Sequence, residues 1–397
     1  MLSNRLSWEI RQNPLLELYN RLISSGVDVI NLSESNPTLA GLDYNKERIE
    51  KALLSSENFI YRPDPRGLLR AREAVCAYYQ GKGISIKIEN IFLTASTSEA
   101  YSFLFKLLCS PGDSVLIPKP GYPLFEYLSS LEGIETIFYR LEYVSNSGWE
   151  IDFHSMERAY RKNTKAIILI NPNNPTGSYI KPQEMKNIIE FCRKKNLALI
   201  VDEVFIDFIL EEKKELINSF AGAATVGIDD VLIFTLSGIS KILGLPQMKL
   251  GWIITRGPED ILEKVLKNLE IISDTYLSVS TPIQNALPEI MSLRSSFQEK
   301  FINRLKSSLN FIKESFKNSP FQPLKAGGGW TLILEVPKII SEEEWALRLL
   351  EEENCFTYPG YFFDFEKEAF LSISLILQPE KLKEGINRIK RIFKKNK

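Results

Sequence analysis

The sequence contains only one histidine and four cysteines in 397 residues. A single histidine, His154, leaves little material for a histidine base or for several histidine ligands, and we interpret it as a surface or loop residue. The cysteines lie far apart without a CxxC spacing, so neither a zinc site nor a disulfide framework is indicated, and no metal is expected. They are Cys76, Cys109, Cys192 and Cys355.

The sequence also lacks an excess of either charge, because 49 Lys and Arg against 50 Asp and Glu give a net charge of −1. No strong field draws such a chain to nucleic acid or an anionic membrane, so we expect a small-molecule substrate. The sequence has no apolar run long enough to span a bilayer, and its N-terminus lacks the apolar region of a signal peptide, which favours a cytoplasmic protein. The length suggests one large and one smaller domain.

Apolar runs typical of buried strands alternate with amphipathic stretches typical of helices through the middle of the chain. This alternation predicts an α/β fold, with a three-layer α/β/α large domain around a mostly parallel sheet and a smaller α+β domain. We assign residues 1–45 to an N-terminal arm and part of the small domain, 46–289 to the large domain and 290–397 to the rest of the small domain. Strands are expected at 27–32, 91–94, 135–139, 166–170, 197–201 and 231–234, and helices at 68–79, 153–162, 181–195, 258–272 and 296–317.

Three of these strands run into polar residues: Asn174 after residues 166–170, Asp202 after 197–201, and Lys241 after 231–234. In an open parallel sheet, ligands bind at the carboxyl ends of the strands. An amide, a carboxylate and a lysine are therefore expected to converge there.

Lys241 follows its strand among small residues, within the stretch Ser237–Lys241. Desolvation next to an apolar pocket would lower the pKa of such a lysine and favour the neutral, nucleophilic amine that Schiff-base chemistry requires. Taken alone, the stretch also fits a solvated loop lysine.

The ordered motifs NPNNPTG (residues 171–177), DE (202–203) and SGISK (237–241) make the chain similar to the class I and II aminotransferases. These are fold type I enzymes that use pyridoxal 5′-phosphate (PLP). The resemblance covers nearly the whole chain. It implies a homodimer that moves an amino group from an amino acid, or a related amine, to a 2-oxo acid.

The resemblance also implies roles for individual residues. Lys241 is expected to hold PLP as a Schiff base and later to shuttle the proton at the reacting carbon. Asp202 is expected to pair with the pyridinium nitrogen, Asn174 to bind the phenolic oxygen, and Tyr122 to stack on the ring. A core tyrosine is the alternative for Tyr122.

Several residues are expected to bind the cofactor phosphate. Thr97 and Ser98 begin a predicted helix, where unpaired amides and the helix dipole attract anions, although the same hydroxyls also suit simple capping. Ser240 and Lys249 are further candidates, with Lys249 in the place of the family's usual arginine. Tyr61 corresponds to a tyrosine that reaches the neighbouring subunit's phosphate; an aromatic loop anchor is the alternative.

The residues expected to contact the substrate depart from the family pattern. Ser372 replaces the arginine that clamps the α-carboxylate, and Ser35 replaces a glycine whose backbone holds the same group. Either another cation does this work, or the amino donor lacks that carboxylate. We favour a relocated cation, since amino acid donors dominate the family. The candidates are Arg62, Arg66 and Lys119.

Two other departures concern the cofactor. Phe205 replaces a tyrosine that donates to the phenolic oxygen, and its loss is expected to raise the pKa of the Schiff base. Gly238 replaces a serine often found near the phosphate. Two other functions remain open: a PLP-dependent lyase or decarboxylase on the same scaffold, and a non-catalytic PLP-binding regulator.

Overall fold

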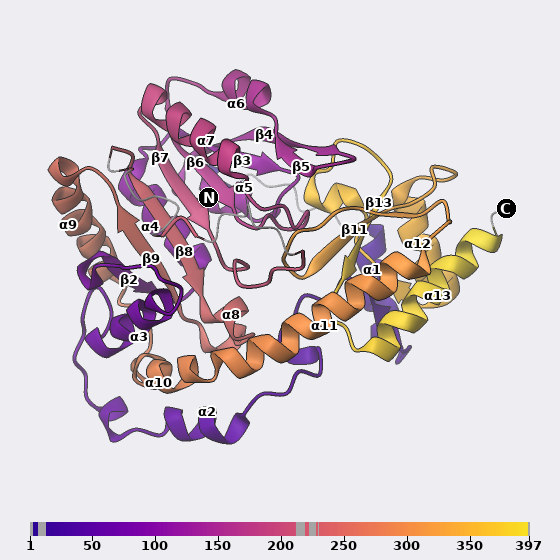
Figure 1. Ribbon diagram of the computed structural model, residues 1–397, viewed down its shortest axis with the longest axis horizontal. Helices are drawn as coiled ribbons and strands as arrows, with labels where there is room; N and C mark the ends of the chain where they lie inside the picture. Colours follow the sequence, from indigo (N-terminus) through magenta and orange to yellow (C-terminus); the bar gives the residue numbers. More distant parts are fainter. Residues whose placement is uncertain (1–2, 7–12, 212–218, 222–227, 229, 396–397) are drawn as a thin grey trace.

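The computed structural model describes residues 3–6, 13–211, 219–221, 228 and 230–395. An eight-stranded sheet organises one part of the chain, and two small sheets with the C-terminal helices organise the other, with the long helix α11 (Arg294–Ser315) running between them (Figure 1). The candidate site is built at the edge where these two parts meet.

The large sheet has the strand order β2-β9-β8-β7-β6-β3-β4-β5. Strands β8, β7, β6, β3 and β4 are parallel, whereas β9 runs antiparallel to both of its neighbours and β5 runs antiparallel to β4. The strands are β2 (Ile91–Thr94), β3 (Ser114–Lys119), β4 (Glu135–Val144), β5 (Gly148–Ile151), β6 (Thr164–Ile170), β7 (Ala198–Asp202), β8 (Ile233–Gly238) and β9 (Gly251–Arg256).

Helices cover both faces of this sheet because its central strands are apolar on both sides. On β6 and β7, Ile168 and Ile200 pack into one cluster with Phe103 of α4, whereas Ile167 and Leu199 pack into another with Ile188 of α7. This mostly parallel, three-layer arrangement confirms the predicted α/β class. The helices are α2 (Lys46–Leu53), α3 (Leu69–Gln80), α4 (Thr97–Leu108), α5 (Phe125–Glu132), α6 (Phe153–Ala159), α7 (Pro182–Lys195), α8 (Ile239–Ile242), α9 (Glu259–Tyr276) and α10 (Thr281–Ser292).

The smaller part contains an antiparallel sheet of order β10-β11-β13 and a parallel pair of β1 with β12. Its largest core cluster joins both sheets to α11 and to the C-terminal helices, with Trp345 fully buried in it. Its other elements are β1 (Ile30–Asn31), β10 (Gln322–Pro323), β11 (Thr331–Glu335), β12 (Cys355–Phe356), β13 (Phe370–Ser374), α1 (Pro14–Ser24), α12 (Glu342–Glu353) and α13 (Pro379–Lys395).

Some predicted elements have different limits in the structure. The strand expected at 27–32 is reduced to Ile30–Asn31, because its partner β12 offers only two residues for pairing. The helix expected at 153–162 ends at Ala159. Helix α1 begins at Pro14, where Asn13 caps it by accepting hydrogen bonds from the next amides, and part of the predicted arm before it lies outside the described residues. The domain limits at 45 and 289 stay predictions.

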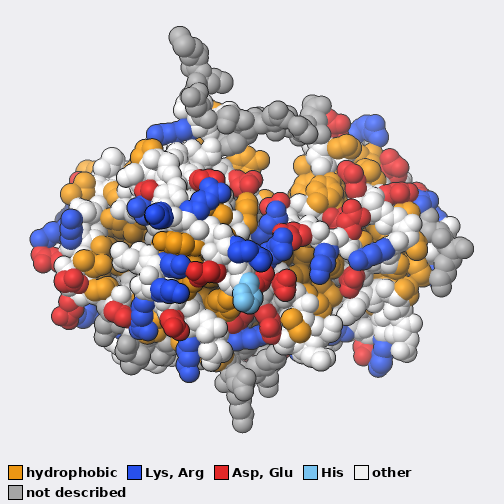
Figure 2. All heavy atoms as spheres, turned by 90° about the horizontal axis from the view of Figure 1, so that it is seen from above, with side chains coloured by type: hydrophobic (Ala, Val, Ile, Leu, Met, Phe, Trp, Pro, Cys, Tyr) orange, Lys and Arg blue, Asp and Glu red, His pale blue; other side chains and the backbone are white. Residues whose placement is uncertain are grey.

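The surface carries both charges close together, and Figure 2 shows basic and acidic side chains interspersed over the face in view. His154 is exposed on α6, as expected of a surface residue. The four cysteines are free thiols. Across the described ranges, no helix is long and apolar enough to cross a membrane.

Candidate active site

Lys241 lies in α8, one turn beyond the buried strand β8. The strand leaves the sheet at Gly238, where a Cβ would lie 2.9 Å from both the Gly251 Cα and the Leu250 carbonyl oxygen. Close backbone approach therefore requires glycine at this position. The same tight packing fixes the turn that carries Lys241.

The Lys241 amine lies beside two aromatic rings. Its Nζ is 5.0 Å from the ring centroid of Trp330 and 5.5 Å from that of Phe205. Burial lowers the pKa of Lys241, and the Asp202 carboxylate partly opposes this shift. A lower pKa increases the share of neutral amine, which is the nucleophilic form.

Asp202 ends β7, the strand adjacent to β8, and is almost fully buried. Its Oδ1 accepts a hydrogen bond from the Val204 amide and its Oδ2 accepts one from the Tyr101 hydroxyl, both at 3.1 Å. Burial raises the pKa of Asp202 to about 6, while these two hydrogen bonds and the Lys241 ammonium act in the opposite direction. A cation placed against this carboxylate would favour its charged form.

Asn174 follows β6 in the turn predicted from the NPNNPTG motif. Asn173 organises this turn: its Oδ1 accepts from Thr176 Oγ1 at 2.9 Å, and its backbone amide donates to the Ser178 carbonyl at 2.8 Å. Gly177 has a positive φ of 68°, and a Cβ there would lie 2.5 Å from the Gly328 carbonyl oxygen. The rigid turn holds Asn174 at the same sheet edge as Asp202.

The N-terminus of α4 provides an anion-binding position. Ser96 is the N-cap, with Oγ accepting from the Glu99 amide at 3.2 Å, and Glu99 Oε2 accepts from the Ala95 amide at 2.7 Å. This reciprocal capping leaves the first-turn amides of Thr97 and Ser98 available to a ligand, with the positive end of the helix dipole behind them.

Tyr122 forms an aromatic wall near this helix. It is 46% exposed and meets Phe125 edge to face at 6.5 Å, and Phe125 meets Tyr101 in the same way at 5.0 Å. Burial and then the charge of Asp202 raise the pKa of Tyr122. An exposed ring that adjoins Asp202 suits the stacking role better than that of a core tyrosine.

One cavity of about 310 Å³ brings together Lys241, Asp202, Asn174, Tyr122 and the N-terminus of α4. Residues from the strand ends of the large sheet form one wall, and residues from β11 and the segment after β1 form the other. The predicted site residues that line it are Ser35, Thr97, Ser98, Tyr122, Asn174, Asp202, Ser240, Lys241 and Lys249.

Tyr61, Arg62, Arg66 and Ser372 do not line this cavity. Tyr61 and Arg62 are exposed and border a separate cavity of about 220 Å³. The Arg66 guanidinium is held by Glu270 at 2.6 Å, and it also donates to the Glu89 carbonyl at 2.8 Å.

Ser372 is buried in the middle of β13, where its carbonyl accepts hydrogen bonds from Ser33 and Thr357. Lys119 also lies outside the lining, 3.8 Å from Asp364. Within one chain, therefore, Arg66, Lys119 and Ser372 all lie outside the lining of this cavity, and the relocated cation that we favoured from the sequence stays a prediction.

The sequence matches the model of the family "Aminotransferase class I and II" over residues 27–389. The chain belongs to this family. Its enzymes use PLP, and the protein is accordingly a PLP-dependent aminotransferase.

Several curated proteins and solved structures are similar to this aminotransferase. Nicotianamine aminotransferase A of Hordeum vulgare is 29% identical over 346 residues, which cover 83% of this chain and 72% of the relative. Glutamate-pyruvate aminotransferase AlaA of Haemophilus influenzae is 27% identical over 381 residues, or 94% and 92% of the two chains. Alanine aminotransferase from Pyrococcus furiosus superimposes with a TM-score of 0.87 at 23% identity and full coverage of both chains, which shows the shared fold.

The groups in the aminotransferase cavity fit PLP. Asp202 is a buried carboxylate with a raised pKa, and the positive charge of a pyridinium nitrogen would lower that pKa. Lys241 is a buried amine with a lowered pKa. The available amides at the start of α4, together with Ser240 and Lys249, suit a phosphate. No group of three or more candidate metal ligands occurs among the residues that the structure describes.

Sequence reasoning missed several residues of the aminotransferase cavity. Tyr101 lies one turn after Thr97 on α4, so helical spacing from the predicted anion site could have identified it. Glu34 adjoins the predicted Ser35. Trp330 and Thr331 carried no signal, because they come from a distant strand that only tertiary packing brings to the cavity.

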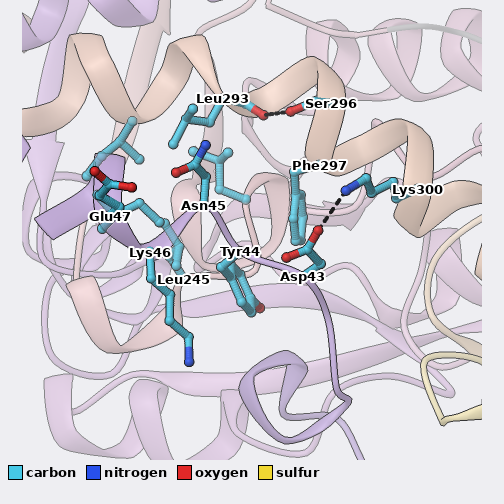
Figure 3. Close-up of a pocket in the computed structure, with 13 residues that line it drawn as sticks. Asp43, Tyr44, Asn45, Lys46, Glu47, Leu245, Leu293, Ser296, Phe297 and Lys300 are labelled. Atoms are coloured by element: carbon cyan, nitrogen blue, oxygen red, sulfur yellow. Dashed lines mark hydrogen bonds and ion pairs between the residues drawn. The ribbon is translucent and has the colours of Figure 1, made fainter.

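A second cavity, of about 370 Å³, adjoins the segment that follows Lys241 (Figure 3). There the Tyr44 hydroxyl donates to the Gly244 carbonyl at 2.7 Å, and its ring stacks on Phe297 at 5.4 Å. Figure 3 shows Asp43 and Lys300 pointing toward each other, and they form an ion pair of 2.7 Å. None of the predicted site residues lines this cavity.

Proposed function

We propose that the aminotransferase transfers the amino group of an amino acid or related amine to a 2-oxo acid, using the predicted site residues of the Lys241 cavity. The observation that carries this proposal is the meeting of the Lys241 amine, the Asp202 carboxylate and the Asn174 amide at three adjacent strand ends. When bound, PLP supplies the carbonyl that takes up the amino group and the ring that stabilises negative charge on the reacting carbon.

Lys241 binds the cofactor covalently in this proposal. With the cofactor bound, the free amine of Lys241 would act as the base that removes the proton from the donor carbon and as the acid that gives it back. Support comes from the lowered pKa of Lys241, which is caused by burial and makes the neutral amine more available as a base. Trp330 and Phe205 confine this amine and exclude water from it.

Asp202 keeps the ring nitrogen protonated through a charged hydrogen bond. The Tyr101 hydroxyl and the Val204 amide hold the carboxylate in place by hydrogen bonds. The carboxylate can still accept a hydrogen bond from a cationic partner on the cavity side. Asn174 donates to the phenolic oxygen. Phe205 has no donor to add there, so we propose that Asn174 acts alone at that oxygen.

Thr97, Ser98, Ser240 and Lys249 hold the phosphate. Lys249 contributes a point charge and cannot make the planar bidentate contact of an arginine, so the helix amides carry more of the binding. Support comes from the residues at the start of β9. Leu250 and Gly251 approach Gly238 closely, which places the preceding Lys249 on the side of the cavity where Ser96 caps α4.

We also propose a homodimer in which Tyr61 serves the site of the other subunit. Support comes from three large apolar side chains that are nearly adjacent in sequence and strongly exposed: Leu54 at 83%, Phe59 at 93% and Tyr61 at 79%. Light scattering should give twice the chain mass of 45.4 kDa, and Phe59→Asp should shift the protein toward that single-chain mass. The cytoplasmic location predicted from the sequence stays a prediction.

The first experiment loads the purified protein with pyridoxamine 5′-phosphate and adds 2-oxo acids in turn. Return of the yellow, PLP-bound absorption together with formation of an amino acid is expected, and Lys241→Ala should lose the catalysed reaction. Release of carbon dioxide, or of ammonia with a keto acid, from an amino acid donor would favour the decarboxylase or lyase. Binding of the cofactor without turnover of any substrate would favour the regulator.

A further inference from the structure

The helix that carries Lys241 is short, and side chains from outside the large sheet hold its C-terminal end. Helix α8 has four residues, and carbonyl groups at the end of a helix need donors from elsewhere. Gln298 Nε2 donates to the carbonyl of Ile242, the residue after Lys241, at 3.0 Å. The Tyr44 hydroxyl donates to the Gly244 carbonyl at 2.7 Å. The place of Lys241 therefore depends on these two donors.

Gln298 is buried on α11, and both ends of its side-chain amide are engaged. Nε2 also donates to Asp207 Oδ2 at 2.6 Å, and Oε1 accepts a hydrogen bond from Arg294 at 3.1 Å. Asp207 in turn accepts a hydrogen bond from the Tyr78 hydroxyl and forms an ion pair with Lys82. A buried polar network whose members all have partners is rigid. The donor to α8 is therefore held in one orientation.

Tyr44 is fixed by Phe297, the residue that precedes Gln298 on α11. The two rings stack with their centroids 5.4 Å apart, and Figure 3 shows them side by side. Gly244 has a φ of +61°, and a Cβ there would lie 2.8 Å from the Tyr44 hydroxyl oxygen and 2.8 Å from Phe297 Cζ. Such a close approach requires glycine. Two consecutive residues of α11 thus hold the turn that follows Lys241.

Helix α11 also contacts the aromatic wall beside the Lys241 amine. Phe301 follows Phe297 by one turn and packs on Trp330, with the ring centroids 5.0 Å apart. Lys241 Nζ lies 5.0 Å from the centroid of the same Trp330 ring. Because α11 continues into the core of the smaller part of the chain, this helix connects Lys241 with both parts of the structure.

We propose that Gln298 and Tyr44 are positioning residues for Lys241, which aim its amine at the reacting carbon by holding the end of α8 against α11. This inference rests on the proposed function and adds two residues from outside the cavity. Neither residue lines the Lys241 cavity, so each acts through the backbone of α8. The effect is worth measuring, because a misplacement of about 1 Å between reacting groups lowers a rate about 100-fold.

The first measurement needs no cofactor. Burial lowers the pKa of Lys241, and loosening of its turn would expose the amine and return that pKa toward the ordinary value of a lysine. The pH dependence of Lys241 acetylation by acetic anhydride in the apoprotein, followed by peptide mass spectrometry, reports this pKa. Tyr44→Phe and Gln298→Met should each move the midpoint upward by about half a pH unit.

The second measurement is the conversion of the PLP-loaded enzyme to its pyridoxamine form by an amino donor. Both variants should lower the rate constant at saturating donor about 10- to 100-fold. The donor concentration at half-saturation should stay within about twofold, because the cavity lining is unchanged. Tyr44→Phe keeps the ring that stacks on Phe297 and removes only the hydroxyl, so it alone decides the test if Gln298→Met does not fold.

Leu309→Ala is the matched control. Leu309 is buried on α11, about three turns beyond Gln298, and packs in the core of the smaller part. Its truncation leaves a cavity and should lower the melting temperature at least as much as the loss of one hydrogen bond. The acetylation midpoint and the conversion rate of this variant should nevertheless match those of the unmodified protein.

The outcomes separate this inference from the proposed function. If no amino donor or 2-oxo acid changes the cofactor bound to the unmodified protein, the proposed function fails, and the acetylation midpoints still test whether the two residues position Lys241. If Tyr44→Phe and Gln298→Met fold, bind PLP and keep both the midpoint and the rate constant, the inference is refuted. Equal losses in Leu309→Ala would also refute it, because the effect would then be one of stability.

Discussion

The Tyr101 hydroxyl donates a hydrogen bond of 3.1 Å to Oδ2 of Asp202, and both residues are buried. This bond lowers the pKa of Asp202, which burial has raised to about 6. Asp202 holds a ring nitrogen only when it is charged, so Tyr101 acts as a positioning residue that extends cofactor binding toward acid pH.

Replacing Tyr101 with phenylalanine should therefore move the acid limit of cofactor binding upward. The pKa of Asp202 rises further without this donor, so the carboxylate becomes neutral at a higher pH, and we expect a shift of about one pH unit. The measurement is the association of PLP with the apoenzyme between pH 5 and 8. Tyr139→Phe is the matched control, because that buried hydroxyl donates to the Ile168 carbonyl and not to Asp202. An equal shift in both variants would contradict the assigned role.

Phe205 provides a prediction about the visible absorption of the bound cofactor. Its ring is buried against Trp330, close to the Lys241 amine, and it offers no hydrogen-bond donor. A hydroxyl at this position would stabilise the deprotonated form of the lysine-bound cofactor, so Phe205→Tyr should lower the pH of its visible absorption change by about one unit. Phe205→Leu removes the ring without adding a donor and should leave that pH nearly unchanged. A clearly acidic transition in the unmodified protein would argue against this reasoning.

The cofactor wall of the site could be predicted from the sequence, whereas the substrate wall could not. Asn174, Asp202 and Lys241 each follow an apolar strand, and parallel strands end at the same edge of a sheet, so local patterns sufficed. Glu34 follows β1 and Trp330 directly precedes β11, so they lie far apart in sequence, and only tertiary packing brings them to the cavity.

The fold shows the same division between local and long-range information. The central strands and most helices are specified by their own apolar patterns, and these confirmed the α/β class. Pairing partners are not local information: residues 27–32 look like a strand, but β12 pairs with only Ile30–Asn31. The sequence likewise suggests Arg66 as a candidate cation for the substrate carboxylate, whereas in the structure its guanidinium forms an ion pair with Glu270.

Gly238 gives a prediction about packing at the site. The family often has a serine here, but in this chain a Cβ would meet the Gly251 Cα and the Leu250 carbonyl at 2.9 Å. Gly238→Ser should therefore weaken PLP binding at least tenfold, because the turn that carries Lys241 must shift. Equilibrium dialysis against PLP measures this loss. Gly83→Ser is the comparison, because open space surrounds that glycine, although its positive φ of 76° makes some loss of stability expected there without loss of cofactor.

Glu203 gives a prediction about stability and pH. It is fully buried, accepting hydrogen bonds from Ser219 Oγ at 2.6 Å and the Phe220 amide at 2.5 Å, and burial raises its pKa to about 7. The native state therefore binds this proton more tightly than the unfolded chain, and the free energy of unfolding falls as the pH rises from about 4.5 through 7. Glu203→Gln removes this titration, so between pH 5 and 8 the variant should gain about 3 kcal/mol relative to the original protein. Urea unfolding of both proteins at several pH values tests this, with the exposed Glu344→Gln as control, and a difference that stays constant with pH would refute it.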